Sequence, residues 1–139
     1  MNSVPGKTIV IVDDEKSYVD LLAETLAEHV TNPVATFTRP FSALEALPKI
    51  DVGIIVTDYY MPQLNGLEFL LRARKLKPDI PFIVITGHGL HLSHEDLSHL
   101  PELKAVMYKP FGWRKLADEI VRCWPGADVP LIKTAALSN

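Results

Sequence analysis

The sequence is poor in cysteine and has no excess of basic residues. Cys123 is the single cysteine among 139 residues, so an intrachain disulfide is excluded and a reducing cytoplasm is the expected setting. Lysine and arginine number 14 against 17 aspartates and glutamates, which gives a net charge of −3 at pH 7. Without a basic surface, we expect no direct binding of nucleic acid.

Long apolar runs are also missing. The apolar run nearest the N-terminus, Ile9–Val12, stops at Asp13 and Asp14, which is not the pattern of an export signal. A membrane helix needs about 18 or more apolar residues, and no stretch approaches that length. We therefore expect neither a leader nor a membrane span, and a cytoplasmic protein.

What the sequence does contain is typical of one globular domain. Hydrophobic residues make up 47% and charged residues 22% of the chain, and its length is sufficient to bury a core without disulfides. We predict a domain over residues 1–124. Pro125, Gly126 and Pro130 mark residues 125–139 as a tail, either flexible or packed against this chain or a partner.

Short apolar runs alternate with amphipathic segments. Their strict alternation favours a parallel sheet with helices on both faces. For five strands, the common arrangement is the flavodoxin-like (βα)5 three-layer sandwich with strand order 2-1-3-4-5. The predicted strands are Ile9–Val12, Val34–Phe37, Val52–Thr57, Pro81–Ile85 and Ala105–Tyr108.

The helices carry recognisable start and stop signals. Pro40 can open a helix because a first-turn N–H needs no partner, and Gly66–Leu76 forms a helical stripe that ends before Pro78. Ser93 and Asp96 form a capping pattern, and Pro101 limits the helix that follows to about two turns.

Polar residues with useful chemistry follow four of the predicted strands. In the proposed order these four strands are neighbours, so their carboxyl ends meet on one rim, where open α/β sheets place their sites. The rim combines carboxylates, one hydroxyl and one ammonium. Its members are Asp13-Asp14-Glu15, Asp58, Thr86-Gly87 and Lys109-Pro110.

This set fits a magnesium-dependent phosphoryl transfer. Clustered carboxylates repel one another unless a cation or protons neutralise them, and Mg²⁺ prefers oxygen ligands. An aspartate such as Asp58 can act as the nucleophile and form an acyl phosphate. Lys109 can offer a positive charge, and Thr86 a hydroxyl donor, to phosphoryl oxygens.

The same residues lie in four motifs that arrive in a characteristic order. The sequence from about Lys7 to Trp124 resembles the receiver domain of response regulators in two-component signal transduction. Each motif alone is weak, and their combination is specific. The motifs are Ile9-Val10-Ile11-Val12-Asp13-Asp14-Glu15, Thr57-Asp58-Tyr59-Tyr60-Met61-Pro62-Gln63-Leu64-Asn65-Gly66, Val84-Ile85-Thr86-Gly87 and Tyr108-Lys109-Pro110-Phe111.

The resemblance implies a role for each site residue. Asp58 would be the phosphorylated residue, and Thr86 and Lys109 would bind the phosphoryl group. Mg²⁺ would be held by Asp58, by Asp14 directly, by Asp13 mainly through water, and by the backbone carbonyl of Tyr60. The Lys109–Pro110 bond would be cis, which a proline peptide tolerates.

The resemblance also implies partners. The phosphoryl donor would be a phosphohistidine on a sensor histidine kinase or a histidine phosphotransfer protein. The chain would act on a downstream protein effector or pass the phosphate onward, and would catalyse only its own phosphorylation and dephosphorylation. One position departs from the family, because Val106 stands where receivers commonly carry an aromatic residue.

Other interpretations remain open. Asp13 and Asp14 could merely cap a helix, and four histidines between His88 and His99 could form a zinc site, although no cysteine accompanies them. The fold could serve as a phosphorylation-independent interaction module. A phosphatase with an aspartate nucleophile is a third alternative, but such enzymes place an acid two residues later, where this chain has Tyr60.

Overall fold

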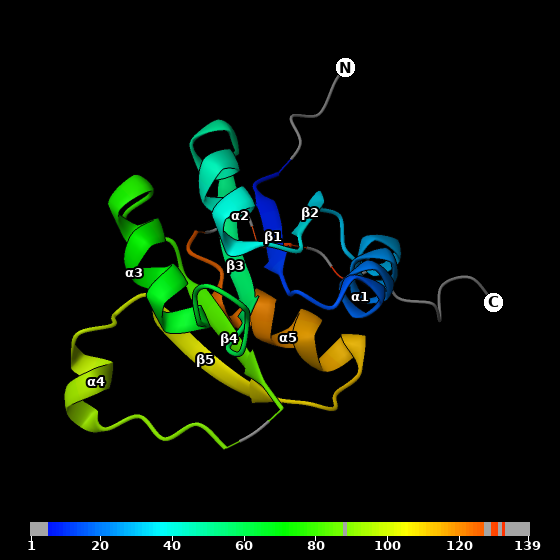
Figure 1. Ribbon diagram of the computed structural model, residues 1–139. Helices are drawn as coiled ribbons and strands as arrows, with labels where there is room; N and C mark the ends of the chain where they lie inside the picture. The colour runs from blue at the N-terminus through cyan, green and yellow to red at the C-terminus, as the bar shows by residue number, and fades with distance from the viewer. Residues whose placement is uncertain (1–5, 88, 127–128, 131, 133–139) are drawn as a thin grey trace.

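The chain alternates strands and helices throughout. The computed structural model describes residues 6–87, 89–126, 129–130 and 132, and Figure 1 shows their arrangement. The elements are β1 (Thr8–Val12), α1 (Lys16–His29), β2 (Val34–Phe37), α2 (Pro40–Ala46), η1 (Leu47–Lys49), β3 (Val52–Asp58), α3 (Gly66–Leu76), β4 (Phe82–Thr86), α4 (His94–Ser98), β5 (Leu103–Tyr108) and α5 (Trp113–Cys123).

The five strands form one parallel sheet in the order β2-β1-β3-β4-β5, so the predicted flavodoxin-like topology is confirmed. The second strand, β2, lies at the edge of the sheet, where its four residues are all partly exposed. In the centre, β3 is buried along its whole length. A strand covered on both faces needs a continuous apolar run, which is what this part of the sequence provides.

Two cores lie on opposite faces of the sheet. Because successive side chains of a strand point to opposite faces, Ile9 and Ile11 pack toward α1 and α5, whereas Val10 and Val12 pack toward α2 and α3. The last helix, α5, turns an apolar stripe to the sheet, with Leu116, Ala117 and Ile120 fully buried. The result is a sheet between two helical layers.

Local signals fix the helix starts. Pro40 is in the first turn of α2, and Ser93 and Asp96 form a reciprocal capping box at α4, both as predicted. At α3, the side chain of Asn65 accepts hydrogen bonds from the backbone N–H groups of Leu67 and Glu68, which is a second capping box. This cap ends the loop that follows Asp58.

Part of the C-terminal tail contacts the domain. Ile132 forms an antiparallel bridge with Val30, just after α1, and Val129 and Ile132 pack against the α1–α5 core. Pro130 between them is buried. Across the described residues, the structure contains no helix that is both long enough and apolar enough to cross a membrane.

Candidate functional site

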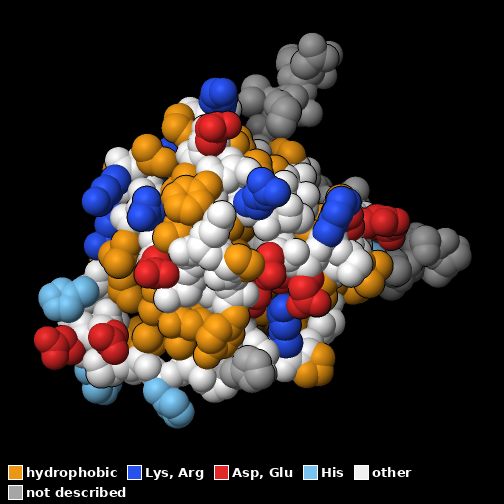
Figure 2. Space-filling model, in the orientation of Figure 1, with side chains coloured by type: hydrophobic (Ala, Val, Ile, Leu, Met, Phe, Trp, Pro, Cys, Tyr) orange, Lys and Arg blue, Asp and Glu red, His pale blue; other side chains and the backbone are white. Residues whose placement is uncertain are grey.

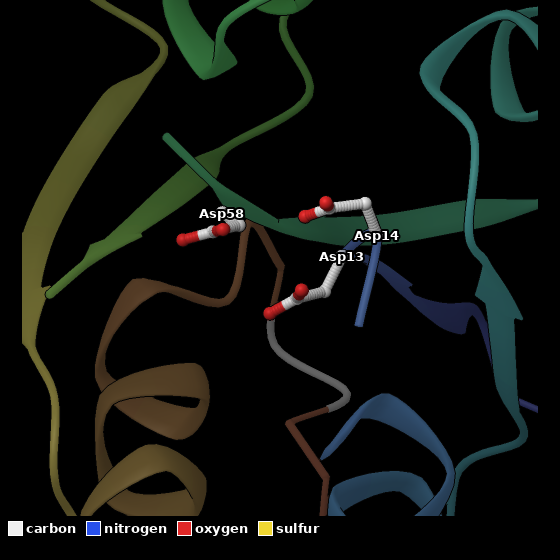
Figure 3. Close-up of side chains that lie close together, drawn as sticks. All are labelled: Asp13, Asp14 and Asp58. Atoms are coloured by element: carbon white, nitrogen blue, oxygen red, sulfur yellow. The ribbon is translucent and has the colours of Figure 1, made fainter. Parts of the chain in front are cut away.

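Three carboxylates meet where β1 and β3 end. Val12 pairs with Thr57 in the parallel ladder, so Asp13 and Asp14 emerge beside Asp58. One ligand oxygen from each of the three lies within 4.8 Å of the others, the only such acidic, histidine or cysteine group among the residues that the structure describes. Figure 3 shows the three carboxylates leaning to the same side of the strand ends.

Lys109 brings a positive charge to this cluster. Its Nζ lies 3.2 Å from Oδ2 of Asp13, 3.7 Å from Oδ1 of Asp58 and 3.8 Å from Oε1 of Glu15. The backbone N–H of Lys109 donates to the carbonyl of Thr86, and the Lys109–Pro110 bond is cis, as the resemblance predicted. The end of β5 therefore delivers an ammonium to acids from β1 and β3.

Burial and mutual repulsion set the electrostatics of the acids. Burial, followed by the charge of Asp13, raises the pKa of Asp58 to about 6, although Lys109 opposes this shift. Burial also raises the pKa of Asp13, against the backbone N–H of Glu15 and the charge of Lys109. Burial alone would lower the pKa of Lys109, but Asp13 and Asp58 more than offset it and the pKa is raised.

An open pocket gives access to this cluster. Its volume is about 360 Å³. Thr86 is completely buried at the end of β4. The residue from this strand end that lines the pocket is Gly87. In Figure 2, acidic side chains gather beside a cationic one where β1 ends. The lining residues are Asp14, Glu15, Asp58, Tyr60, Gly87 and Lys109.

The loop after Asp58 is held tightly against the sheet. The N–H of Tyr59 donates to the carbonyl of Ile85, and the N–H of Gly66 donates to the carbonyl of Tyr59. A Cβ at Gly66 would lie 2.8 Å from the carbonyl oxygen of Asp58, so the close return of the chain requires glycine here. These contacts fix the backbone on both sides of the acceptor candidate.

One residue of the site was missed by the sequence analysis. The ring centroid of Tyr18, in the first turn of α1, lies 4.3 Å from Nζ of Lys109. Tyr18 stands one helical turn beyond Asp14 and Glu15, and this spacing was the available signal.

The donor set suits a hard divalent cation. Two of the three carboxylates, Asp13 and Asp58, have raised pKa values. Three ionised carboxylates at this distance repel one another unless protons or a cation offset their charge. All three offer oxygen atoms, and Asp14, which lines the pocket, is exposed to solvent. A magnesium ion, which keeps several waters, fits such a half-open oxygen site.

The histidines of the α4 region do not form a comparable group. In Figure 2 the histidine side chains there spread over the surface without converging. His91, His94 and His99 belong to no cluster of potential metal ligands among the described residues. His88 lies outside the described residues. The zinc interpretation has no geometric support in the described part of the chain.

Comparison with known families decides the identity of the fold. The model of the response regulator receiver domain matches residues 9–121. The chain belongs to this family. The match spans all five strands, so the receiver domain contains the complete rim described above.

Characterised relatives include other receivers. The response regulator receiver protein CpdR of Brucella abortus is 32% identical over 117 residues, which cover 82% of this chain and 93% of CpdR. The response regulator SaeR of Staphylococcus aureus is 34% identical over 110 residues, covering 78% of this chain. The match spans 46% of SaeR, which is therefore a longer protein than its receiver domain.

Solved receiver structures share the architecture. The response regulator TrrA of Thermotoga maritima, in complex with Mg²⁺-BeF, superposes with a TM-score of 0.70 at 27% identity, over 85% of this chain and 99% of TrrA. A CheY-like receiver domain from Methanospirillum hungatei gives a TM-score of 0.66 at 25% identity, over 82% of this chain and 90% of that protein.

Proposed function

We propose that this receiver domain accepts a phosphoryl group on Asp58 in a Mg²⁺-dependent reaction. The observation that supports this most strongly is the meeting of Asp58, Lys109 and the Asp13–Asp14 pair around one open pocket. Of the three acids, Asp58 has the carboxylate that is both buried and on the pocket wall. With a pKa of about 6, it is mostly ionised and nucleophilic at neutral pH.

The transfer itself needs few groups. A carboxylate oxygen of Asp58 attacks the phosphorus of a phosphohistidine, the phosphorus–nitrogen bond breaks, and the imidazole leaves with its electron pair and takes up a proton. Lys109 stabilises charge on the phosphoryl oxygens from its position 3.7 Å from Asp58. Thr86 is buried at the adjacent end of β4 and would donate its hydroxyl to the same oxygens after turning toward the pocket.

The acids of the rim would also hold the metal. Asp14 and Asp58 would bind Mg²⁺ directly, together with the backbone carbonyl of Tyr60, and Asp13 would act mainly through water. When bound, the ion supplies positive charge that offsets the carboxylates and the phosphoryl oxygens. The likeness to TrrA, whose structure contains Mg²⁺-BeF, supports this assignment.

The donor would be a sensor histidine kinase or a histidine phosphotransfer protein in the cytoplasm. The phosphorylated domain would act by binding a downstream protein or by passing the phosphate onward, without turning over other substrates. Residues 1–124 would form the receiver and 125–139 its tail. The match of the family to residues 9–121 supports this division.

Intact mass spectrometry tests the proposal. The protein is incubated with acetyl phosphate, with and without Mg²⁺, alongside Asp58→Asn and the control Asp118→Asn, whose acid is exposed on α5. The expected result is one added phosphoryl mass in the native and Asp118→Asn proteins, present with Mg²⁺ and absent from Asp58→Asn. An unmodified native protein would instead favour a phosphorylation-independent interaction module.

A further inference from the structure

The aromatic face of Tyr18 closes one side of the Lys109 ammonium. The centroid of the ring is 4.3 Å from Nζ, well within the range over which a cation is attracted to an aromatic face. The Lys109 side chain is only 20% exposed, which reduces the competition from water for this contact. The same ammonium lies 3.2 Å from Oδ2 of Asp13 and 3.7 Å from Oδ1 of Asp58.

Among the acids around Lys109, one is close enough to the ammonium for a hydrogen bond. Of the three described acids near it, Nζ is within hydrogen-bond distance of Asp13, at 3.2 Å, whereas its separations from Asp58 and Glu15 are 3.7 and 3.8 Å. Ionic contacts at these longer separations have little directional preference. A further contact that restricts the flexible lysine chain would therefore improve its alignment toward Asp58.

The Tyr18 ring is itself well supported. It packs against the α1–α5 core as a partly buried side chain and shares a small groove wall with Phe111 and Trp113. Trp113 is stacked on His29 at 3.8 Å between centroids and 18° between planes, and Nδ1 of His29 lies 2.8 Å from the carbonyl oxygen of Thr25. The packing of α1 against α5 therefore supports the Tyr18 ring.

From this arrangement we propose that Tyr18 is a positioning residue for phosphoryl transfer, acting through its ring face on Lys109. The inference rests on the proposed function, because the benefit of a fixed Lys109 appears only when Asp58 receives a phosphoryl group. It assigns the effect to the ring and none to the hydroxyl. Phenylalanine at position 18 should therefore preserve the positioning of Lys109, whereas an aliphatic side chain of similar reach should not.

Three variants separate this role from a structural one. Tyr18→Leu removes the aromatic face and keeps an apolar side chain, Tyr18→Phe keeps the face, and Tyr108→Leu makes the same change at an exposed tyrosine next to Lys109. Thermal melting and the stabilisation produced by Mg²⁺ are measured for each, because an intact acid cluster should keep its metal response.

The first readout is independent of phosphorylation. In protein labelled with ¹³C-lysine, the Hε resonance of Lys109 is assigned as the one lost in Lys109→Arg. An ammonium held over a ring places these protons in the ring current, so the resonance should lie upfield in the native and Tyr18→Phe proteins. In Tyr18→Leu it should return to the position of an exposed lysine. An unshifted native resonance would overturn the inference, whether or not Asp58 is phosphorylated.

The second readout is the rate of phosphorylation by acetyl phosphate at a fixed Mg²⁺ concentration. Tyr18→Leu should be about three- to tenfold slower than the native protein, as expected for loss of one partly buried cation–π contact. Tyr18→Phe should be within about twofold of native, and Tyr108→Leu unchanged. Equal rates for native and Tyr18→Leu, or equal losses in Tyr18→Phe and Tyr18→Leu, would overturn the positioning role. A native protein that is never phosphorylated, yet shows the upfield resonance, would remove the proposed function and with it the role of Tyr18 in transfer.

Discussion

Nζ of Lys109 lies 3.7 Å from Oδ1 of Asp58, although Asp58 ends β3, Lys109 follows β5, and the two residues are far apart in the sequence. The contact exists because β3, β4 and β5 are parallel neighbours whose carboxyl ends share one edge of the sheet. It connects the candidate nucleophile with the single cationic side chain that lines the described pocket.

Removal of the Lys109 charge should slow phosphorylation strongly. For Lys109→Ala, we expect a decrease of about 10²-fold in the rate with acetyl phosphate, comparable to the loss of one preorganised donor at a reacting oxyanion. Lys109→Arg, which retains the charge in a different shape, should lie between this variant and the native protein. The rates are measured by intact mass spectrometry. Equal phosphorylation rates for the native protein and Lys109→Ala would contradict a role for Lys109.

Magnesium should stabilise the folded protein. A ligand that binds only the native state raises the free energy of unfolding, by about 2.7 kcal/mol when its concentration is 100 times the dissociation constant. We expect millimolar Mg²⁺ to raise the melting temperature of the native protein and of Asp118→Asn at pH 7.5. The increase should vanish in Asp14→Asn and Asp58→Asn. Retention of the full increase in both acid variants would place the ion elsewhere.

The stability of the metal-free protein should depend on pH through Asp58. Its pKa is raised from 3.8 to about 6 in the folded state, so between these values the folded chain binds more protons than the unfolded chain. This group therefore lowers the free energy of unfolding as the pH rises from about 4 to 7. Because Asn does not titrate, Asp58→Asn should remove about 1–3 kcal/mol of that decline.

Urea unfolding at several pH values, in the presence of EDTA, measures this effect. The difference in stability between Asp58→Asn and the native protein should grow in favour of the variant as the pH rises, and level off above about pH 7. Asp118→Asn serves as the control, since its acid is exposed. Parallel curves for Asp58→Asn and the native protein would show that the Asp58 environment does not raise its pKa.

The tail should contribute to the stability of the domain. Val129 and Ile132 pack against the α1–α5 core, and Ile132 is bridged to Val30. Replacing both with alanine should lower the free energy of unfolding by about 1–3 kcal/mol, since both side chains are only partly buried. The exposed Leu97→Ala provides the comparison. Unchanged urea midpoints would mean that the tail contact adds nothing in solution.

Much of this fold could be predicted from the sequence because its central strands are short and mostly apolar. Val52–Thr57 reads as a strand buried on both faces, and once five such runs alternate with helices, the sheet order follows from general rules. The same order explains why the acids and Lys109 could be expected on one rim. Val34–Phe37 was predicted with its observed bounds, whereas the ends of the other strands differ by one or two residues, as at Asp58, because pairing with neighbours decides where a strand ends.

Features that depend on three-dimensional packing were harder to predict from the sequence. The contact between Tyr18 and Lys109 joins α1 to the end of β5. The spacing of one helical turn connects Tyr18 with Asp14 and Glu15 but does not extend to Lys109. Asn65 and Glu68 have capping-box spacing, but their role became clear only with the tight return of the chain at Gly66. The raised pKa of Asp58 likewise reflects burial and the charge of Asp13.

The central claim is that the ends of β1, β3, β4 and β5 surround one divalent ion and one phosphoryl group. A crystal structure of the protein with Mg²⁺ and beryllofluoride tests it most directly. The prediction is a metal about 2.1 Å from oxygens of Asp14, Asp58 and the Tyr60 carbonyl, with beryllofluoride on Asp58 in contact with Thr86 and Lys109. A metal ion bound away from Asp58, or a beryllofluoride group that Lys109 does not contact, would contradict the account.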